Sequence, residues 1–297
     1  MTARAWIALG TVYVIWGSTY LGIALAGETI PPVFAAGVRF LLAGGLIGGW
    51  VLLRHGPARF RVGRAELASA LLIGVLLLGA NAMLFVAERH VPIGLASLLI
   101  ASVPLWIVLL RSLTGDRPHR VALLSVATGF AGIAVLVRPE GSTSAGHILL
   151  VLASACIWAV GSFLSARLPL PTDAFVATAI EMAAGGAVLL LLGIAVAGDE
   201  PLSPGSWSNR SLLGLGYLIL VGSLIGYTAY VWLLAHVRIG TVATYAYVNP
   251  VVAILLGVVV LDEGVSWRIA AGATIVLASV AVVIRQDAAR VVEPFSE

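Results

Sequence analysis

The sequence contains no lysine, and only 10% of its 297 residues are charged. Soluble domains carry about 25% charged residues. Here 60% of the residues are hydrophobic and the mean hydropathy is +1.06. This composition excludes a sizeable soluble domain and indicates a polytopic membrane protein. The net charge of +3 does not indicate a nucleic-acid partner, because the arginines lie mainly between apolar runs.

Cysteine and the common catalytic motifs are also scarce. Cys156 is the single cysteine, which excludes a disulfide within the chain. The patterns GxxxxGK[ST], HExxH and GxSxG do not occur, and the five histidines are far apart. We therefore predict no enzyme activity, no metal and no cofactor. An intramembrane enzyme remains a remote alternative, which requires polar groups that converge at one depth. A membrane scaffold or receptor is a further alternative, which predicts tight packing between the two halves with no cavity.

Long apolar runs dominate the chain, and they are continuous rather than alternating. Such runs are typical of membrane-spanning helices, which need about 20 apolar residues each. The predicted fold is therefore all-α with ten transmembrane helices. They lie at 5–25, 32–53, 66–87, 92–111, 121–137, 146–165, 174–197, 211–234, 239–261 and 267–284.

The arginines predict the orientation of these spans. On the side of the N-terminus the loops and span ends hold twelve arginines, against four on the other side. Basic residues accumulate in cytoplasmic loops. We predict a multi-pass protein of the plasma (inner) membrane with both termini in the cytoplasm.

An internal repeat divides the chain into two halves. Pairs separated by 146 residues are His90/His236, Gly94/Gly240 and Pro104/Pro250, and pairs separated by 142 are Trp16/Trp158 and Arg39/Glu181. Each half holds five predicted spans, and an odd number inverts the second half in the membrane. We predict two inverted five-helix repeats, residues 1–140 and 141–297, an arrangement that suits secondary transporters.

Five motifs in this order resemble the EamA-type members of the drug/metabolite transporter superfamily. They are YVIWGSTYLGI, GVRFLLAG, GLASLLIASVPL, YAYVNPVVAILLG and DEGVSW. The resemblance implies an inner-membrane exporter of small metabolites with a 5+5 inverted fold. It also implies a central cavity lined mainly by spans 1, 3, 4, 6, 8 and 9, and it implies no single substrate.

Two prolines lie near the middle of predicted spans. Pro104 and Pro250 are about eleven residues into their spans, or roughly 17 Å at the helical rise. Each removes a helix hydrogen bond and frees the carbonyl of Ile100 or Ala246. Broken helices at the midplane favour substrate sites in inverted-repeat transporters; the alternative is a packing kink. The amide of Asn249 is predicted to bind substrate or to cap a freed carbonyl.

Arg39 and Glu181 are the only charges deep within predicted spans. Their depths leave about 6 Å of vertical separation, which long side chains could bridge. One hypothesis is a structural role, either as an ion pair or with the arginine bonded to helix carbonyls. The other makes Glu181 a proton carrier, because burial favours its neutral form while a nearby arginine favours the charged form.

Aromatic and small polar side chains complete the set of candidates. Aromatic residues on a shared helix face could line a cavity, with helix packing or an interfacial belt as the alternative, and serines such as Ser102 more often join helices. The predicted substrate-binding and pathway residues are Trp16, Tyr20, Asn81, Ser102, Pro104, Trp158, Tyr227, Tyr230, Thr244, Tyr245, Asn249 and Pro250.

The expected partners are a small-molecule substrate and the lipid bilayer, with protons and a second copy of the chain as further candidates. Amino acids or amphipathic organic compounds and drugs are the leading substrates, because the candidate cavity is aromatic and carries few charges. An importer or exchanger of another small solute, such as a sugar or a nucleotide-linked metabolite, is the alternative. No nucleic acid is expected.

Overall fold

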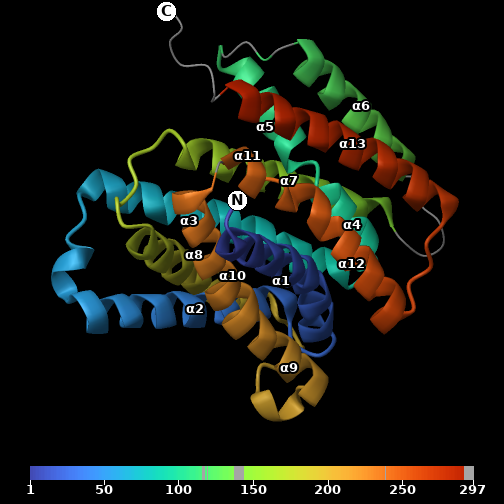
Figure 1. Ribbon diagram of the computed structural model, residues 1–297. Coiled ribbons are helices and arrows are strands. Elements are labelled where there is room, and N and C mark those ends of the chain that lie inside the picture. Colours follow the sequence, from blue (N-terminus) through green and yellow to red (C-terminus); the bar gives the residue numbers. More distant parts are fainter. Residues whose placement is uncertain (116–117, 119, 137–143, 238, 291–297) are drawn as a thin grey trace, which may run out of the picture. The chain divides into compact units, whose positions relative to one another are not determined.

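The computed structural model describes residues 1–115, 118, 120–136, 144–237 and 239–290. Every regular element in these ranges is a helix, which confirms the all-α prediction (Figure 1). The α-helices are α1 (Ala3–Gly27), α2 (Pro32–His55), α3 (Arg64–Glu88), α4 (Ile93–Ile100), α5 (Val103–Leu113), α6 (Arg120–Leu136), α7 (Ala145–Ser165), α8 (Ala174–Val196), α9 (Asn209–Tyr217), α10 (Gly226–His236), α11 (Ile239–Val242), α12 (Tyr245–Leu261) and α13 (Trp267–Arg290). Two short 3₁₀ turns, η1 (Pro57–Phe60) and η2 (Pro204–Ser206), lie in loops, and the π-helix η3 (Leu218–Ile225) joins α9 to α10.

Among the described residues, eight helical segments are long and apolar enough to cross a membrane. They are Ala3–Gly27, Pro32–His55, Arg64–Glu88, Ile93–Leu113, Ala145–Ser165, Ala174–Val196, Asn209–Leu234 and Trp267–Gln286. Two further apolar helices, α6 and α12, have 17 residues each. Helices suit such apolar sequences because each backbone group finds its hydrogen-bond partner within the segment.

The helices form two compact units, each with residues from both halves of the sequence. Unit 1 comprises Met1–Tyr20, His90–Ala159 and Gly226–Glu297. Unit 2 comprises Leu21–Arg89 and Val160–Ile225. A unit boundary therefore falls within α1, and another falls within α7.

Glycines let α2 and α8 of unit 2 pack backbone against backbone. A Cβ on Gly44 would lie 2.6 Å from the Ala183 nitrogen, and one on Gly186 would lie 2.4 Å from the Leu41 nitrogen. Real Cβ atoms do not approach a backbone so closely, so larger side chains would force the helices apart. The contacts also establish an antiparallel register in which Gly44 lies opposite Ala183.

The other face of α8 packs on α3 in the same manner. A Cβ on Gly74 would lie 2.3 Å from the carbonyl oxygen of Glu181, and one on Gly185 would lie 2.6 Å from the oxygen of Gly74. α8 is thus the central helix of unit 2, held on both sides by contacts that only glycine permits.

In unit 1, α6 lies along α13 (Figure 1). Gly132 of α6 faces Ile275, and Gly272 of α13 faces Leu136, each with a built Cβ less than 3.0 Å from the neighbouring side chain. Small residues again allow close approach of two apolar helices.

Both proline-containing segments of unit 1 are broken, but only one break lies at its proline. α4 ends at Ile100 and α5 begins at Val103, so Pro104 occupies the first turn of α5, where its missing N–H costs no helical bond. The second break lies between Val242 and Tyr245, whereas Pro250 is inside α12. The expectation of a break at Pro250 is therefore wrong in position, because α12 continues through the proline.

Candidate functional site

Three aromatic rings from three helices meet in unit 1. The ring centroid of Trp16 on α1 lies 4.8 Å from that of Tyr230 on α10 and 5.0 Å from that of Tyr245 on α12. The Tyr230 and Tyr245 rings are 6.0 Å apart at an angle of 84°. These separations and the edge-to-face geometry are those of attractive aromatic contacts. We call Trp16, Tyr230 and Tyr245 the aromatic cluster.

Helix periodicity presents Trp16 to this cluster, and glycine makes room for it. Tyr13 and Trp16 are three residues apart on one face of α1. A Cβ on Gly226, at the start of α10, would lie 2.7 Å from the Trp16 Nε1. The aromatic cluster packs on a buried hydrophobic group formed by Leu9, Val12, Leu233 and Val242. The three rings are therefore held in place by packing against this buried hydrophobic group.

Hydrogen bonds join α1 to the break before α12. The hydroxyl groups of Tyr13 and Thr244 are bonded to each other, and the Thr244 hydroxyl donates to the Thr241 carbonyl at 2.5 Å. Asn249 is buried, and with its amide nitrogen facing the nearby carbonyls it donates to the oxygens of Tyr13 at 3.3 Å and Tyr245 at 3.2 Å. Asn249 thus bonds the Tyr245 carbonyl rather than the predicted Ala246 carbonyl.

The other predicted pathway residues of unit 1 differ in their surroundings. Tyr227 lies beside the aromatic cluster, with its ring centroid 6.3 Å from that of Tyr230. Tyr20 is buried further along α1. The hydroxyl of Ser102 is buried and donates to the Leu99 carbonyl at 2.6 Å, which is a local helix contact. Trp158 is half-buried on α7, and the ring contacts of the described residues do not include it.

Arg39 and Asn81 lie together in unit 2. The Arg39 guanidinium donates from Nη1 to the Asn81 Oδ1 at 3.3 Å and from Nε to the Ser223 Oγ at 3.2 Å. Arg39 is only 6% exposed, and its guanidinium carbon lies 4.6 Å from the centre of the Phe40 ring. The acidic group that acts on this guanidinium electrostatically is Glu88, at the end of α3.

The predicted contact between Arg39 and Glu181 is not among the ion pairs of the described residues. The register of α2 and α8 explains why. Because Gly44 lies opposite Ala183 in this antiparallel pair, residue 188 of α8 lies opposite Arg39 of α2. Glu181 is therefore seven residues along α8 from the position that faces Arg39. That displacement is about 10 Å at the helical rise, so the estimate of 6 Å is wrong.

Glu88, the last residue of α3, is only 8% exposed although it lies at the end of a helix. Its position directly before the charged pair Arg89-His90 suggested solvent. No local pattern could have indicated its burial, because the neighbouring helices that cover it are distant in sequence. Ser223 was missed for the same reason.

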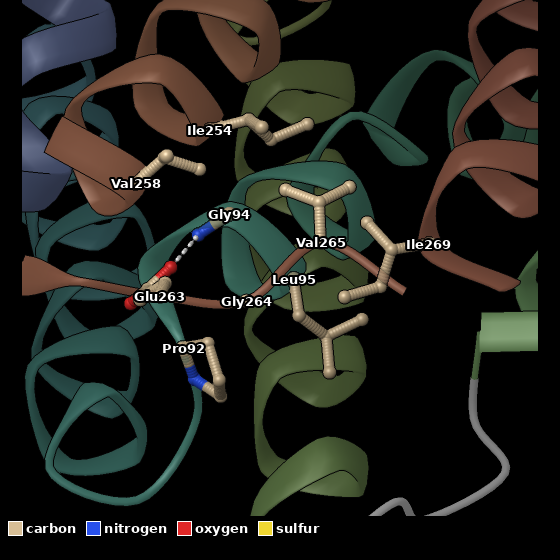
Figure 2. Close-up of a pocket in the computed structure, with 9 residues that line it drawn as sticks. All are labelled: Pro92, Gly94, Leu95, Ile254, Val258, Glu263, Gly264, Val265 and Ile269. Carbon is tan, nitrogen blue, oxygen red and sulfur yellow. Dashed lines mark hydrogen bonds between the residues drawn. The ribbon is translucent and has the colours of Figure 1, made fainter. Parts of the chain in front are cut away.

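A second carboxylate, that of Glu263, caps the N-terminus of α4 in unit 1. Its Oε1 accepts from the Ile93 N–H at 2.7 Å. Its Oε2 accepts from the Gly94 N–H at 3.1 Å, the bond drawn in Figure 2. A Cβ on Gly257 would lie 2.4 Å from the Oε2, so the carboxylate sits directly on α12. Negative charge at a helix N-terminus is stabilising, because the first N–H groups have no partner within the helix.

Apolar side chains surround this carboxylate in a small pocket (Figure 2). The lining residues are Pro92, Gly94, Leu95, Ile254, Val258, Glu263, Gly264, Val265 and Ile269. The motif DEGVSW contains Glu263, but the sequence did not indicate that this residue caps α4. Among the described residues, no group of three or more His, Cys, Asp or Glu side chains could hold a metal ion.

Comparison with known proteins agrees with this architecture. The model of the EamA-like transporter family matches residues 4–138 and 145–285. The uncharacterized inner membrane transporter YedA of Escherichia coli (strain K12) is 40% identical over 255 residues, which are 84% of this chain and 80% of YedA. A probable amino-acid metabolite efflux pump of Salmonella typhimurium (strain LT2) is 28% identical over 285 residues, 90% of each chain.

A solved crystal structure shares the fold. It superposes with a TM-score of 0.66 at 23% identity and covers 99% of this chain and all of its own. At this identity the likeness concerns the fold alone. The family match, which covers nearly the whole chain, establishes the relationship: this chain belongs to the EamA-like transporter family.

Proposed function

We propose that this chain is a secondary transporter of the inner membrane that exports small metabolites by alternating access. The observation that carries the proposal is the pair of broken helices, α4–α5 and α11–α12, in a chain that belongs to a transporter family. Relatives of this chain include an uncharacterized inner membrane transporter and a probable amino-acid metabolite efflux pump. Amino acids and amphipathic organic compounds are therefore the proposed substrates.

The proposed architecture is ten spans in two inverted repeats, with both termini in the cytoplasm. The contacts between α2 and α8 support it. Two contacts join these helices, Gly44 with Ala183 and Leu41 with Gly186. In the 142-residue repeat, Gly44 corresponds to Gly186 and Leu41 to Ala183. Each contact is therefore the repeat equivalent of the other. Such reciprocal contacts are expected where a two-fold axis relates two helices. The two consecutive family matches agree with the division into repeats.

We propose that the aromatic cluster contributes to the transport pathway. Its rings come from α1, α10 and α12, and the break before α12 is tied to α1 through the Tyr13–Thr244 bond. A change at this break would therefore also displace the rings. Non-helical backbone at membrane depth is tolerated where it is buried or lines a cavity.

Export is tested by comparing metabolites in the medium of cells that overexpress the chain with those of cells that lack it. Compounds enriched in the first medium are then tested for uptake into everted membrane vesicles, which turn export into measurable accumulation. The control is the Trp16→Ala variant at an equal membrane level, for which accumulation should fall several-fold. If no compound accumulates above empty vesicles, export is wrong; accumulation only in right-side-out vesicles would indicate import.

A further inference from the structure

The buried guanidinium of Arg39 has more hydrogen-bonding capacity than its neighbours use. Arginine carries five N–H donors in a planar fork. Within the described part of the chain, its hydrogen-bond acceptors are the neutral oxygens of Asn81 and Ser223, at 3.3 and 3.2 Å. A carboxylate binds an arginine at about 2.7–2.9 Å through two parallel bonds. The present contacts are thus weaker than those the group is built to make.

The surroundings of Arg39 point to function rather than to packing. Arg39 is the eighth residue of α2, so it lies about 10 Å along an apolar helix, where a cation is costly and is commonly functional. Ser223 belongs to η3, an eight-residue π-helix. π-helical turns are rare and occur frequently at functional sites. A cation within an apolar helix and a π-helical segment, two independent features, therefore meet at the Arg39 guanidinium.

The acidic side chain that acts on Arg39 electrostatically is Glu88, at the end of α3. Both Glu88 carboxylate oxygens are inaccessible to solvent. Arg39 and Glu88 are both buried and are of opposite charge type, so a ligand that carries net charge would add an uncompensated charge to a low-dielectric interior. A zwitterion adds a carboxylate without adding net charge.

We propose that Arg39, with Asn81 and Ser223, binds the carboxylate of the transported metabolite, and that the preferred substrates are zwitterionic amino acids. This inference rests on the proposed export function. On binding, the carboxylate takes two N–H donors of the fork, and the oxygens of Asn81 and Ser223 give way to it. Because Arg39 is 6% exposed in this structure, binding requires the neighbouring helices to separate.

The first test measures ligand binding to the purified protein in detergent by its thermal unfolding. The probes are L-leucine, L-threonine and L-phenylalanine, each compared with its amide and with the amine that lacks the carboxyl group. We expect at least one amino acid to stabilise the protein, with binding at least about tenfold tighter than to its amide or amine, because a site built for a polar group rejects analogues that lack it. Equal binding of an amino acid and its amide would overturn the proposal, as would no stabilisation by any probe.

Variants locate the effect at Arg39. Arg39→Lys keeps the charge but removes the fork, so the preference for the acid over the amide should fall to about twofold. Asn81→Ala and Ser223→Ala keep Arg39 and should alter the affinity for the amino acid by about threefold or more while the amine binds as before. The matched control is Arg210→Gln, which removes a partly exposed arginine paired with Glu28 in the same unit.

The outcomes separate this proposal from export itself. If Arg39→Lys does not fold, the two alanine variants decide. Folded variants with unchanged preference for the acid would overturn the carboxylate site. Should vesicles export compounds without a carboxyl group as well as amino acids, export would stand and the Arg39 proposal would fail.

Discussion

Gly186 of α8 lies against the backbone of Leu41 in α2, where a Cβ would be 2.4 Å from the Leu41 nitrogen. The contact is backbone to backbone, so no side-chain rotation can relieve it. It sets the spacing and the register of the two helices. That register decides which polar side chains of unit 2 can meet.

We expect Gly186→Ala to destabilise the protein by about 1–3 kcal/mol or more, because the added methyl group must push α2 and α8 apart. Thermal unfolding of the purified protein measures the effect. The matched control is Gly45→Ala on α2, where a Cβ has no neighbour within 4 Å. Equal stability of the two variants would contradict the packing argument.

Glu263→Gln should lower the unfolding temperature. A glutamine has one acceptor oxygen, so it cannot accept from both Ile93 N–H and Gly94 N–H, and its NH₂ group would face a donor. We expect the free energy of unfolding to fall by about 1–3 kcal/mol, because one of these backbone N–H groups would lose its acceptor. Glu28→Gln, which weakens the partly exposed pair with Arg210, should cost about 0–1 kcal/mol. Similar losses in both variants would argue against a structural role for the cap.

The Tyr13–Thr244 bond is expected to couple α1 to the break before α12. Tyr13→Phe and Thr244→Val each remove one partner. A double-mutant cycle of unfolding free energies should give a coupling of about 0.5–1.5 kcal/mol, the usual net value of such a bond. We also expect both variants to reach normal membrane levels and to export more slowly. If the effects of the two single substitutions on the unfolding free energy simply add, the bond contributes nothing to stability.

Glu181→Gln should reach the wild-type membrane level, because the Arg39 guanidinium bonds Asn81 and Ser223 in its place. If Glu181 carries a proton, export in everted vesicles should no longer respond to a pH gradient, while substrate exchange at equal pH should persist. A variant that folds poorly and recovers when Arg39 is also neutralised would restore the ion-pair hypothesis. A full response to the pH gradient would eliminate the proton carrier.

The topology prediction concerns both ends of the chain. A reporter that is active only in the cytoplasm should function when fused after residue 297, and a reporter that needs the periplasm should function in the 198–210 loop. The reason is the excess of arginine on the side of the N-terminus, twelve against four. Periplasmic activity at the C-terminus would contradict both the orientation and the odd number of spans per repeat.

Much of the fold could be predicted because its signals are local. The all-helical class is confirmed for the described residues, and the resemblance to EamA-type transporters agrees with the family match. The face of α1 that carries Tyr13 and Trp16 was visible from helix periodicity. The break at Pro104 followed from the geometry of proline.

The partners of the polar residues could not be predicted, since they depend on helix register. Arg39 and Glu181 both lie within apolar helices, yet a displacement of seven residues between α2 and α8 separates them. One-dimensional depth estimates carry no information on such displacements, which depend on where the glycines allow backbones to touch.

The amino-acid sequence by itself determined the membrane class, the helical runs and the candidate aromatic residues, because these follow from hydropathy and helix period. Only the tertiary structure decided that Asn81 and Ser223 bond Arg39, that Glu263 caps α4, and that the second break lies before Pro250. These contacts join segments distant in sequence, and they form where close-packed helices leave a buried polar group no alternative partner.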